Sequence, residues 1–143
     1  MESWGTGSFE NDAATAFVLE VVEDGSVAIE EALEVVLDPD MTELEAEEGA
    51  RAVAAAEIVQ IQLSGDTAQV TDAGLRAWLS ELGEGELSEL LELALEALER
   101  VLGPGSELPE LWGNGQEAAD WRSEVQRLRA ALEAQAKEQA DRP

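Results

Sequence analysis

Apolar residues recur at intervals of three and four positions through most of the chain, and this helical period restricts the fold more than any other feature. Glycine, proline or aspartate interrupts the pattern at each candidate boundary. The clearest stretch, residues 86–102, carries one broad apolar stripe: Leu87, Leu90, Leu91, Ala94, Leu95, Leu98, Val101 and Leu102. Only residues 59–63 alternate between apolar and polar, which leaves a strand there as the less favoured alternative. The sequence therefore predicts an all-α fold.

The predicted fold is a compact, irregular array of about six or seven helices, with a glycine-rich N-terminal loop packed on the core. The expected helices cover residues 13–22, 27–37, 42–63, 72–82, 86–102, 106–112 and 116–135. The third helix begins at a capping-box pattern, Thr42 and Glu45, and has apolar residues on two sides. An arrangement of that kind is typical of a helix at the centre of a fold.

A length of 143 residues indicates one helical domain, 1–143. Residues 1–11 are expected to form an ordered loop, because their two aromatic side chains would gain nothing in a flexible tail. The polar residues 136–143 are expected to fray. No apolar run approaches the ~20 residues of a membrane span, and the N-terminus lacks the basic and apolar segments of a secretory signal. We therefore expect a cytoplasmic protein.

The composition excludes several kinds of chemistry. Cysteine and histidine are absent, which removes disulfides, thiolate nucleophiles, the usual general base and the commonest transition-metal ligand. The net charge is −25, from 33 acidic and 8 basic residues. Nucleic acids and anionic membranes would be repelled by such a chain, whereas a basic protein would be attracted. No cofactor is predicted.

The sharpest motif is W-G-T-G-S-F-E-N-D, residues 4–12. A phosphate-binding loop needs a lysine followed by a hydroxyl residue after its glycines, but here an aromatic residue and acidic residues follow. A dinucleotide site needs a preceding strand, and none is predicted before the glycines. A structural role is favoured, in which the aromatic side chains fill the core, the glycines make tight turns and a polar residue caps the first helix. These anchor residues are Trp4, Gly5, Gly7, Phe9, Asn11 and Asp12.

This motif resembles the start of a family of small bacterial proteins catalogued as domain of unknown function 4259, whose members begin W-G-x-G-x-F-(D/E)-N-D. The likeness continues within residues 47–57, 97–102 and 106–112, and ends with Trp121 and Leu128. The resemblance implies a compact helical domain. It implies no activity, and so it identifies no catalytic residue.

Glu57 falls in the middle of an apolar helix face, where a carboxylate must be paired or protonated. We predict a structural anchor that accepts hydrogen bonds from N–H groups of residues 4–7, with Arg51 or Arg100 as the alternative partner. Glu47 lies on nearly the same side about three turns earlier. Glu47 and Glu57 are therefore also candidates for an all-oxygen divalent-metal site, although the histidine of di-iron bundles is absent.

Four glutamates are expected on the face of the 86–102 helix opposite its leucines, and we call them the acidic ridge: Glu89, Glu92, Glu96 and Glu99. Only Arg100 can offset them locally. A solvated helix face would explain this pattern without a partner. As a functional hypothesis, the chain is a small non-enzymatic binding or regulatory module that acts on a basic protein partner. A carboxylate-dependent divalent-metal hydrolase and a scaffolding or oligomeric structural protein remain as alternatives.

The net charge of −25 leads to a prediction about stability. Self-repulsion destabilises the compact state, and raising the salt concentration from about 10 mM to about 500 mM shortens the Debye length severalfold. We expect the melting temperature of the purified protein to rise clearly across that range. A flat or falling melting temperature would mean that pairing or bound cations already neutralise the acids.

Overall fold

Six α-helices and one 3₁₀-helix make up most of the described residues of the chain, for which we have a computed structural model. The described residues are 12–38, 40, 43–67, 70, 72–83, 85–103, 106 and 115–140. In chain order the helices are α1 (Asp12–Asp24), α2 (Ser26–Val35), α3 (Ala46–Ser64), α4 (Ala73–Glu81), the 3₁₀-helix η1 (Ser88–Leu90), α5 (Leu91–Leu102) and α7 (Gln116–Ala140). Within these ranges the only strand-like contact is a single bridge between Leu44 and Ser106. The predicted all-α fold is confirmed, and residues 59–63 belong to α3.

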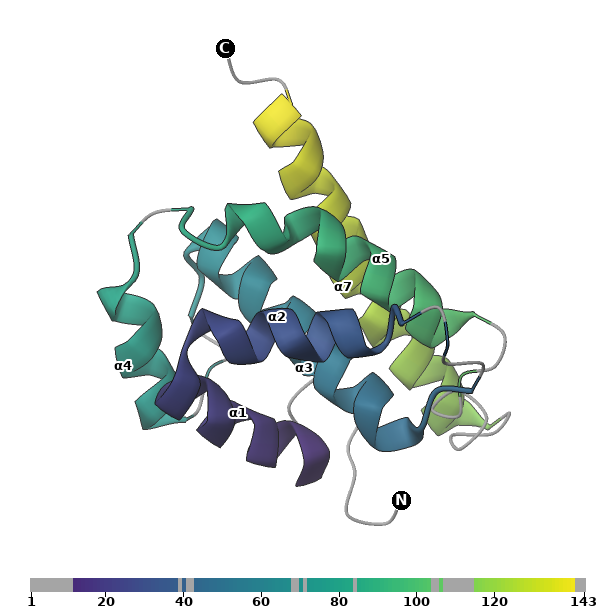
Figure 1. Ribbon diagram of the computed structural model, residues 1–143. Coiled ribbons are helices and arrows are strands. Elements are labelled where there is room, and N and C mark those ends of the chain that lie inside the picture. The colour runs from purple at the N-terminus through teal and green to yellow at the C-terminus, as the bar shows by residue number, and fades with distance from the viewer. Residues whose placement is uncertain are drawn as a thin grey trace.

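Helix α3 lies at the centre of the molecule and packs against α1, α2, α5 and α7 (Figure 1). It is buried along most of its length, including an unbroken run from Ala52 to Val59. That run covers about two helical turns, so α3 is enclosed on every side there. The central position predicted from its two apolar sides is confirmed.

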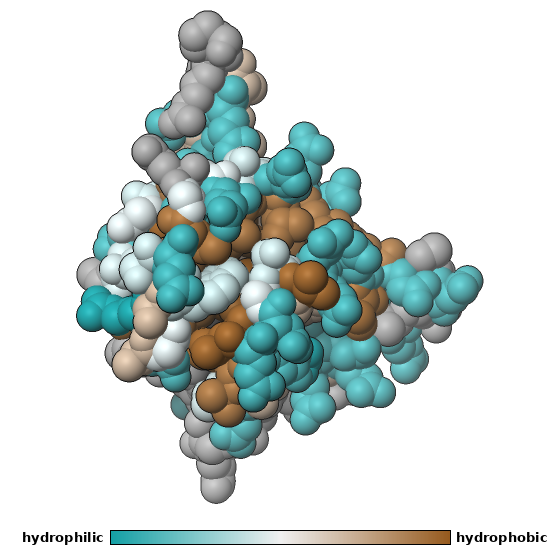
Figure 2. All heavy atoms as spheres, turned by 60° about the vertical axis from the view of Figure 1, so that its left-hand side comes forward, coloured by the Kyte–Doolittle hydropathy of each residue, from teal (hydrophilic) through white to brown (hydrophobic). Residues whose placement is uncertain are grey.

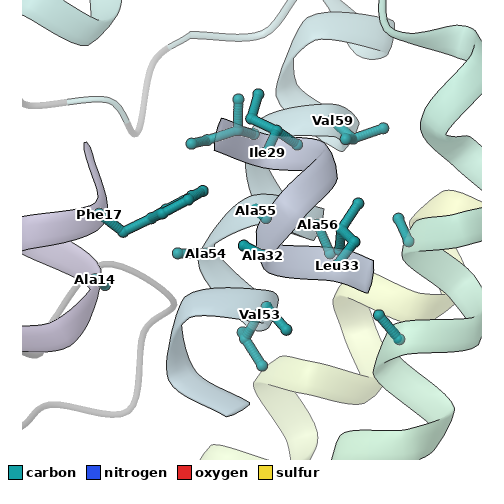
Figure 3. Close-up of a cluster of buried hydrophobic side chains, with 14 of the residues drawn as sticks. Ala14, Phe17, Ile29, Ala32, Leu33, Val53, Ala54, Ala55, Ala56 and Val59 are labelled. Atoms are coloured by element: carbon teal, nitrogen blue, oxygen red, sulfur yellow. The ribbon is translucent and has the colours of Figure 1, made fainter. Parts of the chain in front are cut away.

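Small side chains allow this enclosure. Figure 3 shows Ala54, Ala55 and Ala56 of α3 with the larger Phe17 of α1 and Leu33 of α2 around them. All of these side chains are fully buried. Because the distance between packed helices depends on the side chains at the contact, alanine lets several neighbours approach α3 closely at once.

Local signals set most of the helix boundaries. The chain turns from α1 into α2 at Gly25, whose φ of 76° favours glycine, as the predicted break at 24–26 requires. Helix α3 starts after Glu45, and the Glu45 N–H donates to the Glu48 carboxylate at 3.3 Å. The predicted start at Thr42 is therefore too early. Similarly, the helix predicted at 86–102 opens with a turn and η1 before α5 begins.

Helix α7 is longer than its sequence indicates. It continues to Ala140, so the predicted end of the helix at residue 135 is too early, and residues 136–140 of the segment expected to fray are helical. Ala136 is partly buried against the core one turn after the buried Leu132, and this contact extends the packed face of the helix. The predicted N-terminal loop (residues 1–11), residues 141–143 and all of the predicted 106–112 helix except Ser106 lie outside the described residues.

In the described part of the chain, every helix is too short or too polar to cross a lipid bilayer.

The enclosure of α3 leads to a prediction about packing. Ala55 is fully buried, so Ala55→Leu would add three carbon atoms where its neighbours leave no room. We expect a loss of about 1–3 kcal/mol in the free energy of unfolding, because overpacking forces the surrounding helices apart. Chemical denaturation would measure it. The control is Ala130→Leu on the exposed side of α7, which should change stability by less than about 0.5 kcal/mol.

Candidate functional site

Of the six N-terminal anchor residues, the structure describes only Asp12. It is exposed and forms the first residue of α1, where a carboxylate interacts favourably with the helix dipole. The remaining five lie outside the described residues: Trp4, Gly5, Gly7, Phe9 and Asn11. Their proposed role as a core plug and helix cap stays a prediction.

Glu57 is buried on α3, as predicted, with 9% of its surface exposed. Its carboxylate accepts a hydrogen bond from Arg127 of α7, with Nη2 and Oε1 2.9 Å apart. The partners named from the sequence were residues 4–7, Arg51 and Arg100. Arg127 was missed because it stands 70 positions further along the chain, beyond the reach of any local spacing rule. The predicted bonds to residues 4–7 lie outside the described residues.

The Arg127 guanidinium lies between two carboxylates. Its side chain is half-exposed, and its Nε also contacts Glu124 one turn earlier at 3.3 Å. Partial burial acts to lower the pKa of Arg127, but the Glu57 carboxylate, with help from Glu124, outweighs it, so the pKa is raised. The buried carboxylate is therefore matched by a cation that stays charged, which suits a structural anchor.

Two further arginines also join helices. Arg51 of α3 binds both carboxylate oxygens of Glu20 on α1, one of them at 3.0 Å, and lies 5.4 Å from the centre of the Phe17 ring. Arg129 of α7 binds Glu99 of α5 at 2.7 Å. Together with Arg127, these residues connect α3 to α1 and α7, and α7 to α5. We call them the three bridging arginines.

Glu47 does not join Glu57 in a common site. It is exposed near the start of α3, ten residues before Glu57 on one continuous helix. At 1.5 Å per residue the two positions are about 15 Å apart along the axis, too far for one ion to be bound by both carboxylates. Among the described residues no group of three or more acidic side chains is arranged to hold a metal ion.

The acidic ridge lies on the surface, where the sequence placed it. Glu89 is in η1 and the other three glutamates are on α5, and all four are exposed. Glu99 is held by Arg129, which also binds Glu133 at 3.1 Å. Glu89, Glu92 and Glu96 form no ion pair with any described residue.

Helix α2 carries a second acidic group that the sequence analysis missed. Glu30, Glu31 and Glu34 are all exposed. The pKa of Glu34 is raised, first by a hydrogen bond with the Glu30 side chain, then by slight desolvation and by the charges of Glu30 and Glu31. A signal was present, because Glu30 and Glu34 are like charges four residues apart on a helix. Helix α2 runs beside α5 (Figure 1), so the two acidic groups belong to neighbouring helices.

A comparison with family models matches residues 2–124 to the model described as Domain of unknown function (DUF4259). The chain belongs to this family. The DUF4259 match includes Glu57 and the acidic ridge, and it ends before Arg127 and Arg129. No curated protein and no solved structure matches the chain. Membership confirms the resemblance seen in the sequence and brings no activity with it.

The Glu57–Arg127 pair leads to a prediction about stability. Arg127→Gln would remove the cation beside a buried carboxylate, and Glu57→Gln would remove the charge that Arg127 faces. Each should cost about 1–3 kcal/mol in the free energy of unfolding. In the double variant, a double-mutant cycle should give a coupling energy of about 1 kcal/mol, because the two losses share one interaction.

The matched control is Arg122→Gln, an exposed arginine on the same helix that forms no ion pair with any described residue, and it should cost less than about 0.5 kcal/mol. If Arg127→Gln melts at the same temperature as Arg122→Gln, the pair contributes nothing and the anchor interpretation is wrong.

Proposed function

We propose that this chain is a small acidic binding module, without enzymatic activity, that binds a basic protein partner in the cytoplasm. One observation carries the proposal. The three bridging arginines are occupied between helices, whereas the exposed glutamates Glu89, Glu92 and Glu96 of the acidic ridge and those of α2 form no ion pair with any described residue.

The distribution of charge along the chain supports this interpretation. The first 50 residues contain no lysine and no arginine. Helices α1 and α2 therefore carry no cation of their own. Among the described residues, the ion pair that reaches them joins Arg51 of α3 to Glu20 of α1. A partner with exposed lysine and arginine side chains would supply the charges that this surface lacks.

The raised pKa of Glu34 points the same way. It means that ionisation of this carboxyl is opposed by its neighbours Glu30 and Glu31. A cation placed over α2 would relieve that repulsion and lower the pKa of Glu34. Like-charge repulsion in the free protein is thus converted into affinity for a basic surface. The net charge of −25 would also accelerate encounter with such a partner at low ionic strength.

The alternative of a divalent-metal hydrolase has less support, because Glu57 faces Arg127 and is separated from Glu47 by three helical turns. No observation specifically favours the alternative of a scaffolding or oligomeric structural protein.

The test uses a labelled oligolysine peptide as a defined basic probe and measures fluorescence anisotropy at low and high salt. In the ridge variant, Glu89, Glu92 and Glu96 are all replaced by glutamine. We expect it to bind the probe about fivefold or more weakly than the parent, since each exposed ion pair contributes roughly 0.2–1 kcal/mol. High salt should weaken binding of the parent strongly.

The control variant replaces Glu23, Glu81 and Glu117 by glutamine, which lowers the net charge equally at exposed positions on α1, α4 and α7. It should bind within about twofold of the parent. Equal losses in the two variants would mean that the overall field alone attracts the probe and that no docking surface exists. Binding that ignores salt would contradict the electrostatic basis of the proposal.

A further inference from the structure

A groove lies between the end of α3 and α4 in the described structure. It encloses about 810 Å³, within the range of small-molecule sites. Helix α4 packs against α1, and residues from α4 and from the last turn of α3 line the groove. In Figure 2 the side of the molecule that carries α4 shows residues of intermediate hydropathy (white) and hydrophobic residues (brown) among the hydrophilic ones (teal).

Internal hydrogen bonds hold the groove open. The Gln62 amide donates to the Gly83 carbonyl at 2.6 Å and accepts from the Leu87 N–H at 3.1 Å, which ties the last turn of α3 to the segment after α4. At the other end of α4, the Asp72 side chain caps the helix by accepting from the Leu75 N–H at 2.8 Å. The site is therefore formed before any ligand arrives.

The charge of the groove is opposite to that of the chain. Of the 143 residues 33 are acidic, yet none of the described residues that line the groove is aspartate or glutamate. The lining includes Arg76, whose Nη2 donates to the Thr67 carbonyl at 3.1 Å. No other hydrogen bond and no ion pair of Arg76 is found among the described residues, so most of its five N–H donors are available. The rest of the lining is mixed. Ile61, Leu63, Leu79 and Leu82 give it apolar surface, and the remaining lining residues are small or uncharged polar ones.

We infer that this groove binds a small monocarboxylate with an apolar body. A guanidinium pairs with a carboxylate through two parallel hydrogen bonds, and the leucine and isoleucine side chains would cover the apolar part. Phosphate is disfavoured, because a second negative charge would meet greater repulsion from a chain of net charge −25. This inference uses different residues from the acidic surface proposed above, so either can fail alone.

The experiment titrates the isotope-labelled full chain with 3-phenylpropanoate and follows its amide resonances by NMR. Shifts should concentrate in residues 61–67 and 76–83. The neutral analogue 3-phenylpropan-1-ol and the short anion propanoate should each bind at least about tenfold more weakly, because one lacks the charge and the other the apolar body. Inorganic phosphate should not displace the probe.

The decisive variant is Arg76→Gln, which changes an exposed side chain and should leave the remaining spectrum intact. It should weaken binding of 3-phenylpropanoate at least about tenfold. Arg122→Gln, an exposed arginine on α7, is the matched control and should bind within about twofold of the parent. The inference is overturned if 3-phenylpropanoate causes no shifts at millimolar concentration, if Arg76→Gln binds like the parent, or if the alcohol or phosphate binds equally well.

Discussion

The enclosure of α3 is the constraint on which the rest of the structure depends. From Ala52 to Val59 every side of this helix is buried, and α1, α2, α5 and α7 all pack against it. Such packing requires small side chains, and α3 supplies them in its run of alanines. Within this stretch α3 also has no solvated face on which a polar residue could lie, so Glu57 needs a partner from another helix.

The placement of the few cations follows from this requirement. The three bridging arginines each join two helices, and one of them, Arg127, forms an ion pair with the buried Glu57. A chain of net charge −25 that uses its arginines in this way leaves most of its surface acids unmatched. The repulsion is tolerated because the apolar packing around α3 is extensive, and it is the basis on which we propose a basic partner for this surface.

The two proposals describe complementary parts of one charge distribution. The acidic ridge and the glutamates of α2 are exposed on neighbouring helices, whereas the groove beside α4 has no acidic side chain in its described lining. An anionic ligand that the acidic ridge and the glutamates of α2 repel would be tolerated in the groove. The family assignment bears on neither proposal, since the family is defined without a function.

The sequence by itself determined the helical class, most helix boundaries, the central place of α3, the burial of Glu57 and the exposure of the acidic ridge. All of these follow from local periodicity, from turn residues such as Gly25, and from charge. The predicted end of α7 at residue 135 is too early. The residues around Ala136 are polar, and only the contact of Ala136 with the core shows that the packed face of the helix continues. Tertiary structure alone decided that Arg127 pairs with Glu57 and that Arg76 lines a groove whose described lining has no acidic residue. Both features depend on which helices contact each other. Whole helix faces that are far apart in the chain decide those contacts, and the spacing between neighbouring residues does not encode them.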